Sequence, residues 1–178
     1  MAKLYCSQER YNEAEPLYIE SLELYKNLLG EEHPNVALAI YNIVQMYYLE
    51  ERYSEAEPLC IQALELYKRL FGEEHLNVAL AINNLAELYY WQERYSEAEP
   101  LYIQALELYK RLLGEEHSDV ALAINKLARL YYWQGRYSEA EPLCIQALEL
   151  YKRLFGEEHP DVAKVINNLA LIYDSQGR

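Results

Sequence analysis

The sequence is poor in residues that break a chain or cross-link it. Its 178 residues include only 6 glycines, 6 prolines and 3 cysteines, and most of the glycines and prolines recur at regular intervals. Flexible linkers and disordered chains are rich in glycine and proline, and an odd number of widely spaced cysteines makes no disulfide framework. We therefore expect a packed chain in a reducing compartment, with Cys60 and Cys144 as small buried apolar fillers.

Positive charge and long apolar runs are also scarce. There are 16 basic residues against 29 acidic ones, which gives a formal net charge of −13. Such a field repels phosphate, so neither nucleic acid nor an anionic membrane surface is an expected partner. No stretch approaches the roughly 18 apolar residues of a membrane span, and the first ten residues contain no apolar signal-peptide core. The sequence thus predicts a soluble, cytoplasmic protein.

What the sequence has in abundance is internal repetition. The string EAEP recurs at Glu13, Glu55, Glu97 and Glu139, and GEEH recurs at Gly30, Gly72, Gly114 and Gly156, always in steps of 42 residues. Residues 53–75 reappear letter for letter as residues 137–159. Such a period is typical of arrays in which each unit packs only against its neighbours. We expect one array, with units over about 1–34, 35–76, 77–118 and 119–160 and a terminal helix over 161–178.

Each unit predicts two helices. In the unit 77–118, apolar residues at spacings of three and four indicate a first helix over about 77–92. Ser96 and Glu99 are expected to form a capping box at the start of the second helix, with Pro100 in its first turn and Gly114 just past its end. The whole chain then has about nine helices and no strands, beginning with a shortened helix over 2–8.

The repeated residues resemble a known family. Ile82, Leu85, Ala86 and Tyr89, followed by the Ala98-x-x-x-Tyr102 segment, resemble the tetratricopeptide repeat pattern W-x-x-L-G-x-x-Y…A-x-x-x-F. The ordinary unit has about 34 residues, and this longer form, with strings such as QGRYSEAEPL, is similar to the repeats of kinesin light chains and their bacterial relatives. The resemblance covers essentially the whole chain.

This resemblance implies an all-α fold, a right-handed superhelical solenoid of antiparallel helix pairs. It further implies a concave wall formed by the first helix of each unit, which holds extended peptide segments of partner proteins. On that wall we expect a stripe at spacings of three and four, facing away from the core. The expected peptide-binding residues are Tyr41, Asn42, Gln45, Tyr48, Asn83, Asn84, Glu87, Tyr90, Asn125, Lys126, Arg129, Tyr132, Asn167 and Asn168.

The residue types on this stripe suit a peptide backbone. An amide side chain can pair with both the donor and the acceptor of a peptide unit, and tyrosine adds a broad contact face with a polar tip. The alternative is that Asn42, Asn84 and Asn168 only bridge neighbouring helices. Lys126 and Arg129 form the one close basic pair, which allows a weak clamp for an acidic ligand, whereas Glu87 has the opposite sign.

One departure from the family pattern concerns the turn between the two helices. The family usually has glycine there, whereas this chain has it only at Gly135 and Gly177 and has Glu9, Glu51 and Glu93 in the equivalent turns. If the turn requires a positive φ, each glutamate costs up to about 1 kcal/mol relative to glycine.

Nothing in the sequence indicates an enzyme, a cofactor or a metal site. The four histidines all lie in the GEEH turns, one per repeat, where we expect a capping or turn role. Nucleotide-binding, zinc-protease and nucleophile-elbow strings are lacking, and acidic pairs recur identically in every copy although a catalytic site is normally singular. The leading hypothesis is a non-enzymatic scaffold for protein–protein interaction.

Two alternatives stay open from the sequence. The chain could be the repeat segment of a larger multidomain signalling or effector protein. It could also stack end to end with other copies of itself, because the terminal helix is expected to leave Val165, Leu169, Ile172 and Tyr173 incompletely covered.

Overall fold

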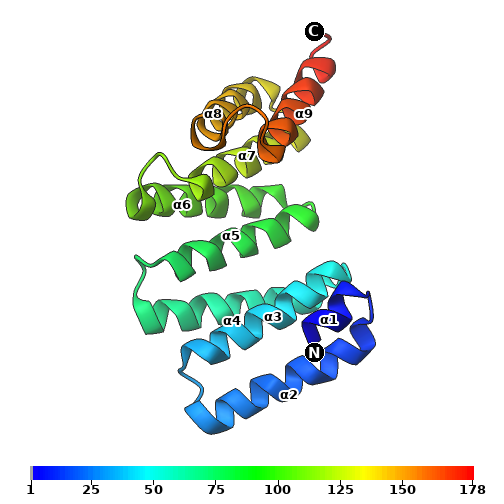
Figure 1. Cartoon of the computed structure of the whole chain (residues 1–178), viewed down its shortest axis with the longest axis vertical. Helices are drawn as coiled ribbons and strands as arrows, with labels where there is room; N and C mark the ends of the chain where they lie inside the picture. The colour runs from blue at the N-terminus through cyan, green and yellow to red at the C-terminus, as the bar shows by residue number, and fades with distance from the viewer. Residues whose placement is uncertain (1) are drawn as a thin grey trace. The chain divides into compact units, whose positions relative to one another are not determined.

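The computed structural model describes the backbone of residues 2–178 and all of their side chains except those of residues 3, 4 and 7. Over this part of the chain there are nine helices and no strand (Figure 1). They are α1 (Ala2–Ser7), α2 (Tyr11–Leu29), α3 (Pro34–Leu49), α4 (Tyr53–Phe71), α5 (Leu76–Trp91), α6 (Tyr95–Leu113), α7 (Ser118–Trp133), α8 (Tyr137–Phe155) and α9 (Pro160–Ser175). The helix bounds expected from the repeat are confirmed to within one residue for α1, for α5 and for the start of α9.

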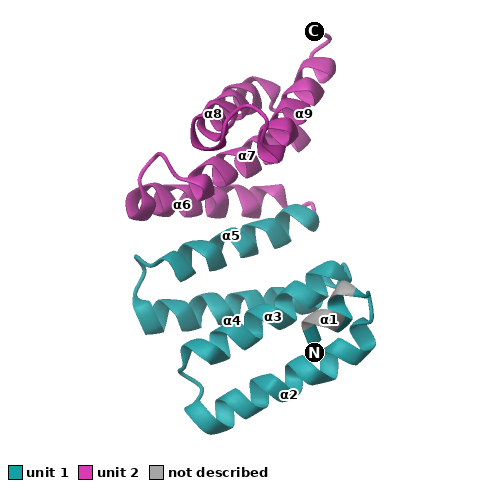
Figure 2. Cartoon of the chain, in the orientation of Figure 1, with its two compact units in different colours: residues 1–92 teal, residues 93–178 magenta. Residues whose placement is uncertain are grey.

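The helices form two compact units, Met1–Gln92 and Glu93–Arg178 (Figure 2). In the first unit, α3 packs between α2 and α4, and α4 packs on α5. In the second, α7 packs between α6 and α8, and α9 packs on α8 and touches α7. From α2 onward, a 19-residue second helix alternates with a 16-residue first helix.

Completely buried alanines recur at corresponding positions of the helices. One alanine near the start of every second helix is completely buried, namely Ala14, Ala56, Ala98 and Ala140. A second series, Ala37, Ala79 and Ala121, is completely buried on the first helices. A larger side chain at such a site would have to displace close-packed neighbours. The repeated alanines therefore fix the spacing of the helix pairs.

Histidines cap the first helices, as expected from the GEEH turns. His33, His75, His117 and His159 each precede a first helix in extended conformation. In each, Nδ1 accepts a hydrogen bond from the backbone N–H two residues later, at 3.1 or 3.2 Å. This bond satisfies one of the donors that every helix start leaves without an intrahelical partner.

The second helices begin differently from the sequence-based prediction. Arg94 is the N-cap of α6 and no side chain caps it, so the expected capping box of Ser96 and Glu99 is wrong, and Pro100 lies inside the helix. The helix begins at Tyr95, and Arg94 bridges to Glu97 across its first turn, with Nη2 to Oε1 at 2.6 Å. Glu99 instead pairs with an arginine of the next repeat.

We call the arrangement around this arginine the arginine clasp; it was not predicted from the sequence. The Arg136 guanidinium lies 4.0 Å over the Tyr131 ring and pairs with Glu99 of the preceding second helix and Glu139 of its own, each at 2.7 Å. Arg52 does the same with Tyr47, Glu15 and Glu55 in the first unit.

The Arg52 clasp shifts the pKa values of two of its members, Glu15 and Tyr47. Hydrogen bonds from Arg52 and Tyr47 hold the pKa of Glu15 below its usual range. Burial, followed by the hydrogen bond to Glu15, raises the pKa of Tyr47 to about 12. The Tyr47 hydroxyl therefore stays protonated and donates to Glu15 at 2.7 Å. Each clasp joins the end of one first helix to the second helix before it.

The turn before the second helix has the positive φ considered from the sequence. Glu9, Glu51 and Glu93 adopt φ of +57° to +59°, and Gly135 and Gly177 adopt +72°. In the α3–α4 turn the N–H of Arg52 donates to the carbonyl of Tyr47, and the N–H of Glu51 donates to that of Tyr48. This is the Schellman arrangement, which favours glycine at the left-handed residue.

The terminal helix is better covered than expected. Val165 is 0% exposed and Ile172 is 1% exposed, so two of the four residues expected to be partly uncovered are in the core of the second unit. The reason is that α9 packs on both α8 and α7.

The histidine caps predict a specific loss of stability. Replacing His33 by Ala removes the acceptor for the Asn35 N–H and should lower the free energy of unfolding by about 1 kcal/mol. Replacing His33 by Asn, whose side-chain oxygen can cap, should retain most of the stability. Urea denaturation followed by circular dichroism measures both. An equal loss in the two variants would contradict a capping role.

The positive φ of the turn glutamates predicts that replacing one of them by glycine raises the stability of the protein. Glu51→Gly removes the Cβ that disfavours φ of +57° and should raise the free energy of unfolding by up to about 1 kcal/mol. Glu51→Ala is the matched control, because it removes the charge but keeps the Cβ. Thermal and urea unfolding should show a gain for glycine alone, and a similar gain for alanine would assign the effect to charge.

A candidate ligand groove on the first helices

A groove lies among α3, α4 and α5 in the first unit. Two adjoining pockets share Tyr41, Val44, Cys60 and Asn84 and so form one depression. The remaining lining residues are Gln45, Tyr48, Ala63, Tyr67, Leu80, Ala81, Glu87 and Leu88. We call these twelve residues the α3–α5 groove.

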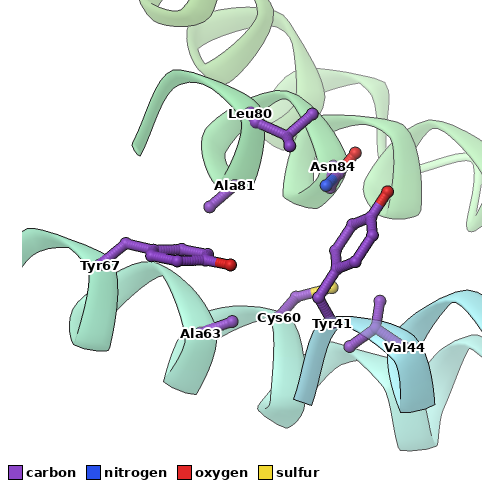
Figure 3. A pocket seen from close by; sticks show the side chains of 8 residues that line it. All are labelled: Tyr41, Val44, Cys60, Ala63, Tyr67, Leu80, Ala81 and Asn84. Atoms are coloured by element: carbon purple, nitrogen blue, oxygen red, sulfur yellow. The ribbon is translucent and has the colours of Figure 1, made fainter. Parts of the chain in front are cut away.

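The groove has two walls and a floor (Figure 3). Tyr41 comes from α3 and Asn84 from α5, and the Tyr41 hydroxyl points toward the Asn84 amide. Cys60, Ala63 and Tyr67 come from the second helix, α4. Two consecutive first helices therefore face each other across the side chains of the second helix that joins them.

The pKa of the Tyr41 hydroxyl reflects the burial, charge and hydrogen bonding in the groove. Burial raises the pKa of its hydroxyl above the ordinary value, and the negative charge of Glu87 raises it further. A hydrogen bond with the Asn84 side chain acts in the opposite sense, because it stabilises the phenolate. Glu87 is the only charged residue among the twelve that line the groove.

Aromatic rings extend the groove at one end. The Tyr48 ring makes edge contacts with Tyr53, at a centroid separation of 5.8 Å, and with Trp91, at 6.2 Å. Trp91 is 45% exposed. Rings held in this way present rigid apolar faces with little entropy left to lose on binding.

The groove cysteine is suited to packing and not to chemistry. Cys60 is 4% exposed, and burial raises the pKa of its thiol to about 12. Cys144, in the same repeat position, is 1% exposed and has a pKa raised to about 11 for the same reason. Because the thiolate is the nucleophile and metal ligand, both thiols are inert near neutral pH. The prediction that they are buried fillers is confirmed.

The second unit repeats the contact between neighbouring first helices. The Asn168 amide of α9 donates to the Asn125 side-chain oxygen of α7 at 3.0 Å. This pair corresponds to Asn84 and Tyr41 in the first unit, each residue lying 84 positions later. The helix-bridging alternative for Asn84 and Asn168 is therefore present in the structure. An amide has two donors and an acceptor with two lone pairs, so bridging uses only part of its capacity.

The structure distributes the fourteen expected peptide-binding residues unevenly. Tyr41, Gln45, Tyr48, Asn84 and Glu87 line the α3–α5 groove. Asn42 lines another pocket, between α2 and α3, together with residues such as Leu17, Tyr18 and Leu38. Asn125, Lys126, Arg129 and Tyr132 are half-buried on α7, and Asn168 is half-buried and Asn167 exposed on α9.

Asn83 and Tyr90 depart from the expected stripe, since each is only 6% exposed. Their helix has nine buried residues, so its packed surface extends round more of the circumference than a simple two-faced helix allows. The residues that form the floor of the α3–α5 groove were also not predicted from the sequence. Cys60 and Tyr67 were recognisable as residues of the apolar stripe of a second helix, but nothing in the pattern showed that they line a depression.

The described residues contain no group of three histidine, cysteine or acidic side chains placed to hold a metal ion. None of the described helices is both long enough and apolar enough to cross a membrane.

Comparisons with known proteins agree on a family and a fold. One family model described as tetratricopeptide repeat matches residues 1–57, 36–109 and 78–132, and a second with the same description matches residues 120–161. No curated protein sequence matches the chain.

Solved structures match almost the whole chain. The crystal structure of BtubC (BKLC) from P. vanneervenii has a TM-score of 0.88 and 28% identity, covering 99% of this chain and 70% of that one. The nearly identical kinesin light chain TPR-like repeats of Podosopora anserina give a TM-score of 0.83 and 24% identity, covering 99% and 83%. The apo form of RapI gives 0.84 at 16% identity, covering 99% and 61%. The expected fold, an all-α array of antiparallel helix pairs, is confirmed.

The groove geometry predicts opposite shifts of the Tyr41 pKa in two variants. Glu87→Gln removes a nearby negative charge and should lower it, whereas Asn84→Leu removes a hydrogen bond to the phenolate and should raise it. The ¹³Cζ shift of labelled tyrosine, assigned with Tyr41→Phe, follows the titration between pH 9 and 12. A shift in the same direction in both variants would contradict the placement of these side chains.

Proposed function

Since the chain belongs to the tetratricopeptide repeat family, in its kinesin-light-chain-like form, and is a scaffold for protein–protein interaction, we propose that it binds an extended peptide segment of a partner protein. The α3–α5 groove is the proposed seat of that segment, and no chemistry accompanies the binding.

The observation that carries this proposal is the composition of the groove. Gln45 and Asn84 can each pair with a peptide N–H and a peptide carbonyl. The same pocket is also lined by the Tyr41 and Tyr48 rings and by the apolar side chains of Val44 and Leu88. A mostly apolar depression with a few converging polar groups is the usual form of a binding site.

The shape of the groove favours an extended chain over a folded surface. Its walls are two consecutive first helices and its floor is a second helix, so it lies in the furrow between helices and not on a flat face. An extended peptide exposes a backbone donor and acceptor at every residue, and alternate side chains point to opposite sides. Amides can hold the backbone while one side chain enters the larger of the two adjoining pockets, beside Gln45, Tyr48 and Glu87.

Peptide display tests the proposal. A random dodecamer library selected on the immobilised chain should yield binders whose dissociation constants are measured by isothermal titration calorimetry. Asn84→Ala and Tyr48→Ala should each weaken the selected peptides by about tenfold, because each removes a polar or aromatic contact in the groove. Gln62→Ala, at an exposed position on α4 outside the groove, is the control and should leave affinity unchanged.

Circular dichroism must show that each variant keeps its helix content. Failure to select any peptide would overturn the proposed function. Binders that respond to Gln62→Ala but not to the groove variants would place the interaction on another surface.

A further inference from the structure

The charge of the α3–α5 groove points to a particular kind of peptide side chain. Glu87 is the only charged residue in its lining, and it lies at the same end as Tyr48 and Gln45. The chain as a whole carries a net charge of −13, so no long-range field opposes a cation approaching this groove.

The neighbours of Glu87 are also those that suit a cation. An arginine or lysine side chain is stabilised by a carboxylate at its head and by aromatic faces along its stem and head. Tyr41 lies close enough to Glu87 for its pKa to be raised by the carboxylate charge, and Tyr48 lines the same pocket. A carboxylate has about four acceptor sites, so Glu87 can receive a cation beside the neighbours it already has.

The second unit provides an internal comparison in which the charge is reversed. Helices α4 and α8 have identical sequences, and Asn168 stands where Asn84 does, 84 residues later. At the positions of Gln45 and Glu87, however, the second unit has Arg129 and Leu171. The same framework therefore carries a negative charge on this wall in one unit and a positive charge in the other.

We propose that the α3–α5 groove selects an extended peptide with an arginine or lysine side chain, which sits against the Glu87 carboxylate between the Tyr41 and Tyr48 rings. This inference rests on the proposed function, since it specifies the ligand of the same groove. It predicts a preference that depends on Glu87 and is abolished by the two residues that the second unit carries at the corresponding positions.

Three fluorescein-labelled heptapeptide pools test the preference. Each has a central arginine, glutamine or glutamate, flanked on both sides by three positions randomised among uncharged residues other than cysteine. Fluorescence polarisation at about 50 mM NaCl measures their binding to the full chain. The arginine pool should bind about tenfold more tightly than the glutamine pool, as expected for a hydrogen bond to a charged group, and the glutamate pool should bind most weakly.

Variants assign the preference to the groove. Glu87→Gln should bind the arginine and glutamine pools equally, whereas the double change Gln45→Arg with Glu87→Leu, which puts a positive charge on the wall, should bind the arginine pool more weakly than the glutamine pool. Glu65→Gln removes one negative charge from an exposed position on α4 outside the groove and should leave the tenfold preference intact. Circular dichroism and thermal unfolding check the fold of each variant.

A salt titration of the wild-type chain provides a test that needs no variant. Affinity for the arginine pool should fall between 50 and 300 mM NaCl, while that for the glutamine pool should stay nearly constant.

The outcomes separate the two proposals. Equal binding of all three pools to the wild-type chain overturns the cation preference and leaves peptide binding standing. A preference that survives both Glu87 variants, or that disappears in Glu65→Gln, likewise overturns the assignment to this groove. If no pool binds and peptide display also fails, the proposed function falls and the cation preference falls with it.

Discussion

The arrangement of this protein depends on how one repeat is held to the next. Buried alanines such as Ala56 and Ala79 let consecutive helices approach closely, and burial of apolar surface against a neighbour supplies the main stabilisation. The arginine clasp then fixes the register. Arg52 pairs with Glu15 of the preceding helix while its guanidinium stacks on Tyr47, so the end of one first helix is tied to the second helix before it.

The groove is a consequence of that packing. Because second helices lie between consecutive first helices, a side chain such as Cys60 becomes the floor between two walls. The Tyr41 hydroxyl points toward the Asn84 amide, and Asn168 donates a hydrogen bond to Asn125, so the walls also contact each other. The amides are thus part of the scaffold as well as candidate ligand contacts, which gives a groove that is already ordered before a peptide arrives.

Near-identical repeats restrict where specificity can reside. Residues 53–75 and 137–159 are the same, so the second helices offer the same floor in both units. The first helices differ at both core and wall positions, and on the groove wall Gln45 and Glu87 correspond to Arg129 and Leu171. A scaffold of this kind can vary its ligand preference by changing wall residues, because the second helix that forms the floor stays constant.

The sequence by itself determined the 42-residue repeat, the positions of the helices, the family and the role of the histidines as caps. These follow from local signals: apolar spacing, turn residues and a cap acceptor within two residues of its donor. Only the tertiary structure decided that Glu99 pairs with Arg136 and forms no capping box, that Asn83 and Tyr90 are buried, and that Cys60 and Tyr67 line a groove. Those outcomes depend on residues about 20 to 40 positions away, and a pattern read along one helix does not contain the neighbour that packs against it.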